Sequence, residues 1–319
     1  MGSMPGQTAQ GANVFERWRR DSRRIERLIF ILVALVPMCA AFVLFWIYPM
    51  LHGVWGSLTL WRGFNPDQPF VGLRQYQNLF RDPIFVKALS NTFYYALLYL
   101  PAGIVLSMCL ALAIEATGAL RGLFRMLYFM PVVTSTIATA LIWRWLYQPS
   151  LGLFNQILAL LGLPAMQFLQ STTQALPSIV VYALWKNLGF NMVLFMAGLS
   201  AIDQTYYDAA RVDGANRWQV FWHITLPLLQ PTMVFVIVTG IIGSLQVFGP
   251  VYVMSSGGGG SALPGGPANA TMVVSVYQWL IAFRELELGY GSAMGVVLFI
   301  IILVVTLVQT RFLRTRWEY

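Results

Sequence analysis

Charged residues are scarce in this chain of 319 amino acids. Asp, Glu, Lys and Arg together make up 10% of it, whereas about a quarter of the residues of a soluble domain are charged. Hydrophobic residues make up 58%, and the mean hydropathy is +0.66. This composition excludes an ordinary soluble domain and predicts a protein embedded in a lipid bilayer.

Cysteine and histidine are also rare, with two residues of each type. Cys39 and Cys109 lie in apolar stretches without C-x-x-C spacing, which favours buried small hydrophobes over a disulfide or a metal pair. His52 and His223 are far apart and form no H-E-x-x-H motif, so no metal site is predicted. A membrane-embedded enzyme would need clustered His, Asp, Glu or Cys within its spans, and the sequence has no such cluster, so no catalytic residues are predicted.

The chain has only two lysines, Lys87 and Lys186, and neither belongs to a G-x-x-x-x-G-K-[ST] phosphate loop. We therefore expect no ATP hydrolysis and no cofactor in this chain. The glycine-rich run at 257–266 is not placed between a strand and a helix, so we expect a flexible external loop there rather than a phosphate cradle.

Long apolar stretches dominate the rest of the sequence. A hydrocarbon core of about 30 Å is crossed by about 20 apolar residues in a helix. Six stretches meet this requirement, near 28–51, 88–116, 123–147, 174–200, 232–254 and 291–312. Because lipid cannot satisfy open sheet edges, the predicted fold is an all-α integral membrane protein with six transmembrane helices. Several spans contain Pro or Gly, expected to mark kinks or close helix contacts, among them Pro101, Pro131, Gly189 and Gly240.

Basic residues in the loops predict the orientation. Thirteen arginines lie before the first span, between spans two and three, between spans four and five, and in the tail, against five basic residues in the longer loops of the other side. The prediction is a cytoplasmic basic segment at 1–27, a membrane domain at 28–313 whose first span is not cleaved, and a cytoplasmic tail at 314–319. The net charge of +8 then reflects topology and anionic lipid, and not nucleic-acid binding.

A polar island interrupts the apolar chain at 207–215 and is followed by Ile224-Thr225-Leu226-Pro227. Its small residues would let a short helix pack closely against a partner, with acidic and basic groups at the rim. Pro227 and Pro231 are expected to stop that helix before the next span. The alternative is an ordinary amphipathic interfacial helix.

The island resembles the "EAA" loop of binding-protein-dependent ABC importer permeases, which reads E-A-A, three residues, G, and later L-P. Asp208 stands here in place of the Glu. The resemblance implies that 207–215 form the coupling helix, which docks in a cleft of a separate ATPase subunit. The residues implied in coupling are Asp208, Ala209, Ala210, Arg211, Asp213, Gly214, Leu226 and Pro227.

Two further segments, 70–92 and 289–294, resemble the sugar-type branch of that superfamily, which includes maltose and glycerol-3-phosphate permeases. The resemblance implies a type I importer permease bundle in a bacterial plasma (inner) membrane, forming half of the translocation path of an ATP-driven sugar importer. It implies a second permease subunit, two ATPase subunits that bind ATP and Mg, and an extracytoplasmic solute-binding protein. The chain itself would be a transport subunit and not an enzyme.

Uncharged polar and aromatic residues in spans four and five are candidates for the sugar path, because hydroxyls need hydrogen-bond partners and sugar C–H faces stack on rings. They are Trp185, Asn187, Asn191, Ser244, Gln246, Phe248 and Tyr252. Hydrogen bonding between helices is an equally common use of such residues. Two interpretations of Lys186 also remain. It has a functional role within the span, or it has a structural one, in which its side chain snorkels along the Trp185 side or pairs with a partner chain.

Two alternatives to sugar import remain at this point. The chain could be an importer permease for another solute, such as glycerol 3-phosphate or a polyamine. A secondary transporter has the same composition, but it would leave the Asp-Ala-Ala island unexplained.

Overall fold

The computed structural model describes residues 29–65, 67–256 and 263–312. The basic segment at 1–27, the tail at 314–319 and Gly257 to Gly260 lie outside the described residues, so the predictions made for them stay predictions. The chain divides into two compact units, residues 1–55 and 56–319.

The first unit contains an apolar helix that runs from Ile29 into α2 (Tyr48–Gly56) through a π-helical turn at Val43–Ile47. Its large side chains are exposed, for example Phe30 and Trp46 at 74% and 72%. A long helix that exposes apolar side chains all round is suited to lipid or to another protein.

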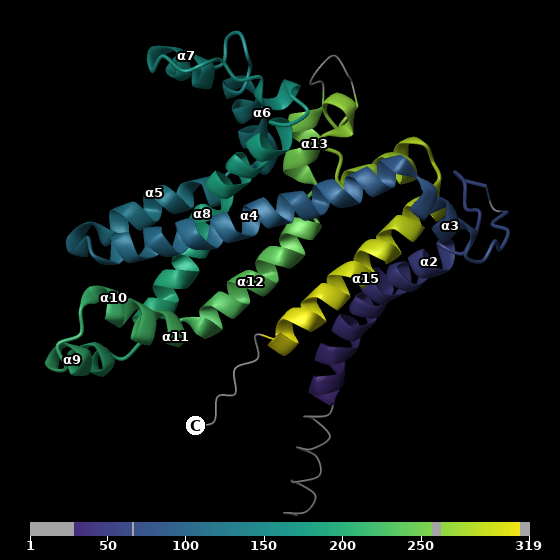
Figure 1. The fold of residues 1–319 in the computed structure, drawn as a ribbon. Helices are drawn as coiled ribbons and strands as arrows, with labels where there is room; N and C mark the ends of the chain where they lie inside the picture. The colour runs from purple at the N-terminus through teal and green to yellow at the C-terminus, as the bar shows by residue number, and fades with distance from the viewer. Residues whose placement is uncertain (1–28, 66, 257–262, 313–319) are drawn as a thin grey trace, which may run out of the picture. The chain divides into compact units, whose positions relative to one another are not determined.

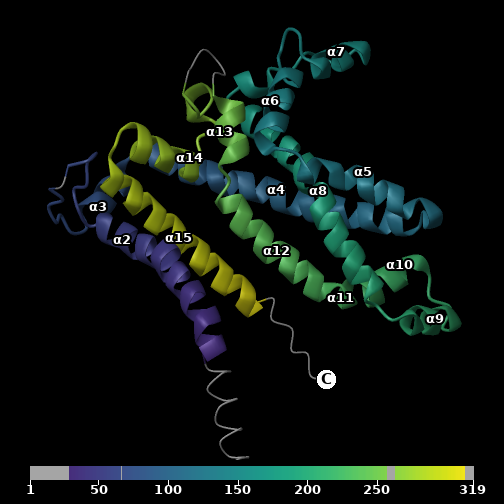
Figure 2. The same ribbon diagram turned by 180° about the vertical axis from the view of Figure 1, so that it is seen from behind.

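The second unit is helical throughout its described part, where no strand occurs and a single isolated bridge joins Thr59 and Phe70. Figures 1 and 2 show its helices from two sides. They are α3 (Arg74–Arg81), α4 (Pro83–Glu115), α5 (Arg121–Val133), α6 (Thr136–Leu146), α7 (Leu153–Leu160), α8 (Ala175–Ser200), α9 (Gln204–Val212), α10 (Arg217–Val220), α11 (Leu226–Leu228), α12 (Gln230–Leu245), α13 (Gly249–Ser255), α14 (Val274–Trp279) and α15 (Leu288–Phe312).

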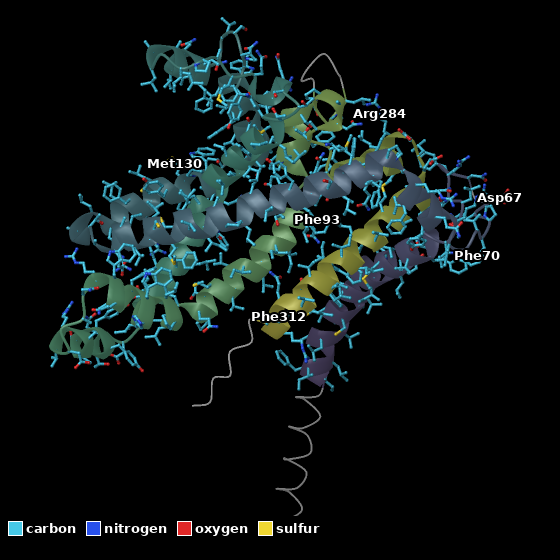
Figure 3. All side chains as sticks on the ribbon, viewed as in Figure 1. Asp67, Phe70, Phe93, Met130, Arg284 and Phe312 are labelled. Atoms are coloured by element: carbon cyan, nitrogen blue, oxygen red, sulfur yellow. The ribbon has the colours of Figure 1, made fainter. Side chains whose placement is uncertain are left out.

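The predicted fold class is confirmed. Among the described residues, four helices are long and apolar enough to cross a membrane, beginning at Ile29, Pro83, Ala175 and Leu288. The number rises to six if two bent pairs, Gly118–Val133 with Thr136–Leu146 and Arg217–Leu228 with Gln230–Leu245, are each one span. Outward side chains on these helices are mainly carbon, as at the labelled Phe93 of α4 and Phe312 of α15 (Figure 3).

Two of the predicted spans are not single straight helices. The stretch 123–147 is broken between α5 and α6, which meet at 96°. Thr134 leaves the helical conformation with a ψ of 155°, and the Ser135 side chain caps the first turn of α6. The stretch 232–254 is likewise divided, because α12 ends before Gln246 and α13 starts after Phe248. Hydropathy alone registers apolar length and not the direction of the chain.

In the part of the second unit that the structure describes, the core has two buried clusters, and α8 contributes to both. Tyr182 and Ile179 belong to the first, with Phe85 of α4 and Met294 of α15. Phe195 belongs to the second, which includes Ile114 of α4 and Leu229. The helix therefore acts as a central support, with α4 and α5 packed along it.

Gly189 sets the distance between α8 and α5. A Cβ atom at this position would lie 2.0 Å from the carbonyl oxygen of Tyr128 and 2.9 Å from the Cα of Phe129. Only glycine allows such a backbone contact, so the prediction that glycine marks a close helix contact is confirmed here.

Asp82 joins three helices of the second unit. One carboxylate oxygen caps α4 by accepting from the backbone N–H of Ile84 at 2.8 Å. The other accepts from the hydroxyls of Tyr277 in α14 at 2.7 Å and Tyr290 in α15 at 2.9 Å. Burial is the main cause of a raised pKa at the Tyr277 hydroxyl, and the hydrogen bond to Asp82 raises this pKa further. The hydroxyl therefore stays protonated and donates to the carboxylate.

Candidate functional site

A cavity of about 440 Å³ lies between α4, α8 and α12, beside the break between α5 and α6 and the break between α12 and α13. Its lining mixes apolar side chains with uncharged polar ones and one lysine, and it includes several aromatic rings. The lining residues are Tyr95, Tyr99, Val132, Thr136, Ala183, Lys186, Asn187, Phe190, Asn191, Thr239, Gly240, Gly243, Ser244, Val247, Phe248 and Pro250.

The structure brings four of the seven predicted path residues together in this lining: Asn187, Asn191, Ser244 and Phe248. Asn187 and Asn191 come from one face of α8, whereas Ser244 and Phe248 come from the end of α12 and the break that follows it.

The other three predicted path residues do not line the cavity. Trp185 packs with its ring centroid 5.2 Å from that of Trp143 and 6.2 Å from that of Tyr182. Tyr252 stacks on Phe248 at 5.3 Å and supports that ring from behind. Gln246 is exposed at the C-terminal end of α12.

Sequence reasoning missed the contribution of α4. Tyr95 and Tyr99 are four residues apart, stack at 5.7 Å with an interplanar angle of 12°, and both line the cavity. Their spacing in the second span was a usable signal, because residues four apart share a helix face. Residue type alone did not distinguish Tyr95 from its neighbour Tyr94, which is exposed and does not line the cavity.

Several polar groups of the lining use their donors within their own helices. The amide of Asn187 donates to the Ala183 carbonyl at 3.0 Å, Thr239 donates to the Phe235 carbonyl at 2.7 Å, and Ser244 donates to the Ile241 carbonyl at 2.9 Å. Their oxygens remain able to accept hydrogen bonds from a bound molecule.

Lys186 is 6% exposed and lies at the wall of the cavity. Its ammonium group donates to the carbonyl of Pro131, to the carbonyl of Thr134 at 2.5 Å and to the Thr134 hydroxyl at 3.2 Å. These groups belong to the last turn of α5 and the break after it. The lysine therefore donates to carbonyls at the C-terminal end of α5, where the Pro131 carbonyl also accepts from the Thr134 hydroxyl at 2.6 Å.

Tyr182, one helical turn before Lys186, holds the other side of the same break. Its hydroxyl donates to the Thr136 carbonyl at 3.0 Å and lies 2.8 Å from the Thr139 hydroxyl, both in the first turns of α6. One face of α8 thus fastens the end of α5 through Lys186 and the start of α6 through Tyr182.

The polar island forms α9, which begins earlier than predicted, at Gln204, and ends at Val212. Gly214 has a φ of 73°. Its N–H donates to the Arg211 carbonyl at 3.2 Å, and the N–H of Ala215 donates to the Ala210 carbonyl at 2.9 Å. This is a Schellman ending. The prediction that Pro227 and Pro231 stop this helix was wrong, because the glycine turn ends it first.

The residues implied in coupling are mostly exposed. Arg211 and Asp208 form an ion pair at 3.0 Å on the surface of α9, beside exposed Ala209 and Asp213. Ala210 is 6% exposed and packs inward.

A short connection leads from α9 to α12. A capping box of Asn216 and Gln219 starts α10. A π-helical turn at Phe221–Thr225 then leads into α11, where Leu226 and Pro227 lie. The Tyr207 hydroxyl lies 3.4 Å from that of Thr225, linking α9 to this connection.

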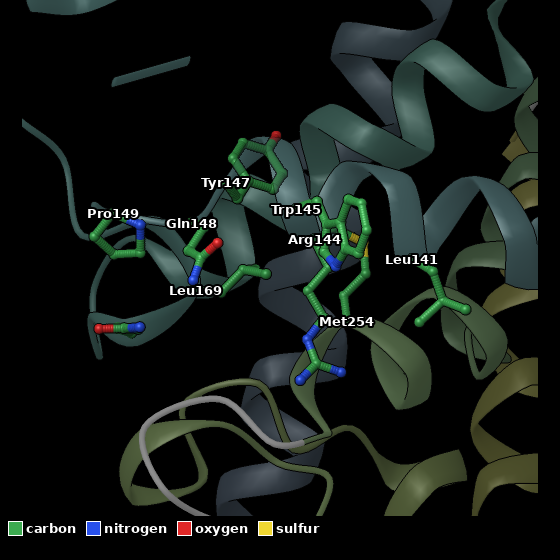
Figure 4. A pocket seen from close by; sticks show the side chains of 9 residues that line it. Leu141, Arg144, Trp145, Tyr147, Gln148, Pro149, Leu169 and Met254 are labelled. Atoms are coloured by element: carbon green, nitrogen blue, oxygen red, sulfur yellow. The ribbon is translucent and has the colours of Figure 1, made fainter. Parts of the chain in front are cut away.

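A second hollow of about 370 Å³ lies at the end of α6. Figure 4 shows Arg144 and Trp145 on that helix, with Gln148 and Leu169 nearby. Arg144 is the only charged residue between Arg125 and Lys186, and within the described ranges it has no carboxylate partner.

Among the described residues, no group of three or more His, Cys, Asp or Glu side chains could hold a metal ion. That this chain holds no ATP, magnesium or other cofactor stays a prediction.

Comparison with known proteins shows which family this chain matches. The family described as binding-protein-dependent transport system inner membrane component matches residues 85–318. The diacetylchitobiose uptake system permease NgcF of Streptomyces coelicolor is 34% identical over 303 residues, covering 90% of this chain and 83% of that protein. The trehalose/maltose transport system permease MalF of Thermococcus litoralis is 33% identical, covering 88% of this chain and 92% of that protein.

A solved bacterial ABC transporter involved in the import of the acidic polysaccharide alginate contains a chain of the same fold. The TM-score is 0.81 at 24% sequence identity, with 94% of this chain and 100% of that chain covered. At this identity the likeness supports the fold. The relatives are named as transporter permeases and not as enzymes.

Proposed function

This chain belongs to the family of binding-protein-dependent transport system inner membrane components, and we therefore propose that it forms half of the solute path of an ATP-driven sugar importer. It is a multi-pass membrane permease subunit of an ABC importer. The proposal concerns the solute, the path and the coupling to ATP.

The observation that carries the proposal is the cavity between α4, α8 and α12. Its oxygens at Asn187, Thr239 and Ser244 can accept from hydroxyls, and the half-buried Tyr99 ring, stacked on the buried Tyr95, offers apolar surface for C–H groups. Relatives named for diacetylchitobiose, trehalose/maltose and lactose transport support a saccharide as the solute.

Coupling runs through α9 in this proposal. Two partner ATPase subunits would bind ATP and Mg, and each would receive the exposed face of a coupling helix, here with Asp208, Arg211 and Asp213 at its rim. Their closure would move α9, and the link from Tyr207 to Thr225 would pass the movement to α11 and α12, whose far end lines the cavity. This is rigid-body switching of a bundle between two states.

The proposal extends to the remaining parts of the assembly. A second permease chain would supply the other half of the path, and a solute-binding protein would deliver the sugar outside the cell. Both termini and α9 would lie in the cytoplasm, as the distribution of arginines predicts.

Co-purification tests the proposal. The chain is extracted from its native membrane in mild detergent, its companions are identified by mass spectrometry, and the complex is placed in proteoliposomes for uptake of labelled saccharides. We expect an ATPase, a second permease and ATP-dependent uptake. A chain that emerges alone and moves solute with an ion gradient would instead be a secondary transporter.

A further inference from the structure

The cavity contains one ammonium group, and its chemistry bears on the charge of the solute. Resting on the proposed import function, we infer that the solute which passes this cavity is an uncharged polyhydroxyl compound, and that Lys186 fastens the broken span instead of binding solute. The inference distinguishes a neutral saccharide from glycerol 3-phosphate, an acidic saccharide and a polyamine.

All three ammonium hydrogens of Lys186 have acceptors within the chain. The carbonyls of Pro131 and Thr134 and the hydroxyl of Thr134 take them, and the Val132 carbonyl lies 3.4 Å away. A lysine has three donors and no acceptor, so nothing is left over for a solute oxygen.

The charge of Lys186 is also compensated where it lies. The end of an α-helix carries about half a negative elementary charge, and Val133 is the last residue of α5. To bind an anion, the ammonium would have to leave this helix end and give up its bonds to the Pro131 and Thr134 carbonyls.

Lys186 is the only charged side chain of the lining in the part of the chain that the structure describes. A phosphate or carboxylate solute would require Arg or Lys donors facing it, and a polyamine would require carboxylates. The cavity offers neither of these. It offers instead the Asn191 amide and the oxygens of Thr239 and Ser244.

Aromatic rings complete the match to a sugar. The Tyr95 and Tyr99 rings stack on one side, and Phe248, supported by Tyr252, lies in the lining from the α12–α13 break. A flat apolar ring beside hydrogen-bond acceptors suits the alternation of C–H faces and hydroxyls on a pyranose.

The first test is a solute panel. The co-purified complex with its binding protein is assayed in proteoliposomes for ATP-dependent uptake of labelled neutral disaccharides, a diuronate, glycerol 3-phosphate and spermidine. We expect neutral disaccharides to enter at least about tenfold faster than the charged solutes, because charges left unpaired in the cavity penalise those. Comparable or faster uptake of a charged solute overturns the inference. No uptake of any solute while ATP is hydrolysed overturns the proposed sugar import itself.

The second test separates fastening from binding. Lys186→Met and Tyr182→Phe each loosen one side of the break, so we expect both to lower the maximal uptake rate while KM for the neutral disaccharide stays within about twofold. Lys87→Met is the matched control, because this other lysine is exposed on α4 and lies outside the cavity. A rise in KM for Lys186→Met alone, at unchanged maximal rate, assigns the ammonium to the solute and overturns the inference.

Discussion

Single residues decide how closely the helices of this permease approach one another. Gly189 permits a backbone contact between α8 and α5 that no side chain would allow. The sequence indicated that glycines in the spans mark such contacts, but not which glycine meets which helix. That depends on the rotation of each helix about its axis, and α8 is apolar on most of its circumference.

We expect Gly189→Ala to destabilise the protein by about 1 to 3 kcal/mol or more, because its Cβ would meet the backbone of Tyr128 and Phe129 rather than a movable side chain. Thermal unfolding in detergent measures the effect. Gly122→Ala in α5 is the control, since nothing lies within 4 Å of the added Cβ there. Equal midpoints for the two variants would contradict the close contact.

Asp203 allows a prediction about pH. Its side chain caps α9 by accepting from the backbone N–H of Thr205 at 2.9 Å, and this bond lowers the pKa of the carboxyl group. A lowered pKa in the folded state means that the stabilisation is present above the unfolded pKa of about 3.9 and is lost as the pH falls through the folded value.

Hydrogen exchange of the α9 amides should therefore accelerate, relative to the intrinsic rate, when the pH is lowered from about 6 to about 3. Asp203→Asn keeps a capping oxygen without a titrating group and should remove this dependence. The same acceleration in that variant would assign it to another group.

At the scale of elements, hydropathy predicted the long apolar stretches of the chain but not where they bend. The stretch 123–147 has the length and composition of one span, yet α5 and α6 meet at 96°. Pro131 was a signal of the break, but Pro101 lies inside the unbroken α4. At the first site α8 holds both sides of the break, because Lys186 donates to the Thr134 carbonyl and Tyr182 donates to the Thr136 carbonyl.

The α9 helix was predicted from its motif, and its ending now refines a test of coupling. Gly214→Glu should leave membrane insertion intact but uncouple uptake from ATP hydrolysis, because bulk and charge are added at the docking face. Nothing lies within 4 Å of the added Cβ, but the φ of 73° strains most residues.

Gly214→Asn separates the effect of added bulk and charge from that of backbone strain, since asparagine tolerates the left-handed conformation of this residue. We expect the Asn variant to keep most of its uptake, measured with ATPase activity in the same proteoliposomes. Normal solute-stimulated ATPase activity and uptake in the Glu variant would refute the docking role of this turn.

Asp82 joins α4, α14 and α15, and its effect belongs to the same scale. Tyr277→Phe removes one hydrogen bond to the carboxylate, and we expect a loss of about 1.5 to 3 kcal/mol in thermal unfolding. The matched control is Tyr94→Phe on α4, which is exposed and removes no hydrogen bond to Asp82. A loss no larger than that of the control would show that the bond contributes nothing.

For the whole molecule, the arginine distribution predicts the orientation in the membrane, with α9 on the cytoplasmic side and Arg74 outside. Asp208→Cys should react with a membrane-impermeant maleimide only in inside-out vesicles, and Arg74→Cys only in right-side-out vesicles. The native Cys39 and Cys109 are replaced by Ala for this purpose. Labelling of both sites from one side would contradict the predicted topology.

The position of Lys186 has a consequence for biosynthesis. It lies near the middle of α8, where a lysine raises the cost of insertion by the translocon by about 2.5 to 3.5 kcal/mol. The carbonyls that relieve this cost belong to α5 and to the break, which the ribosome completes earlier. The fourth apolar segment should therefore insert more completely behind its natural predecessor than behind an unrelated span, so that the order of synthesis contributes to correct assembly.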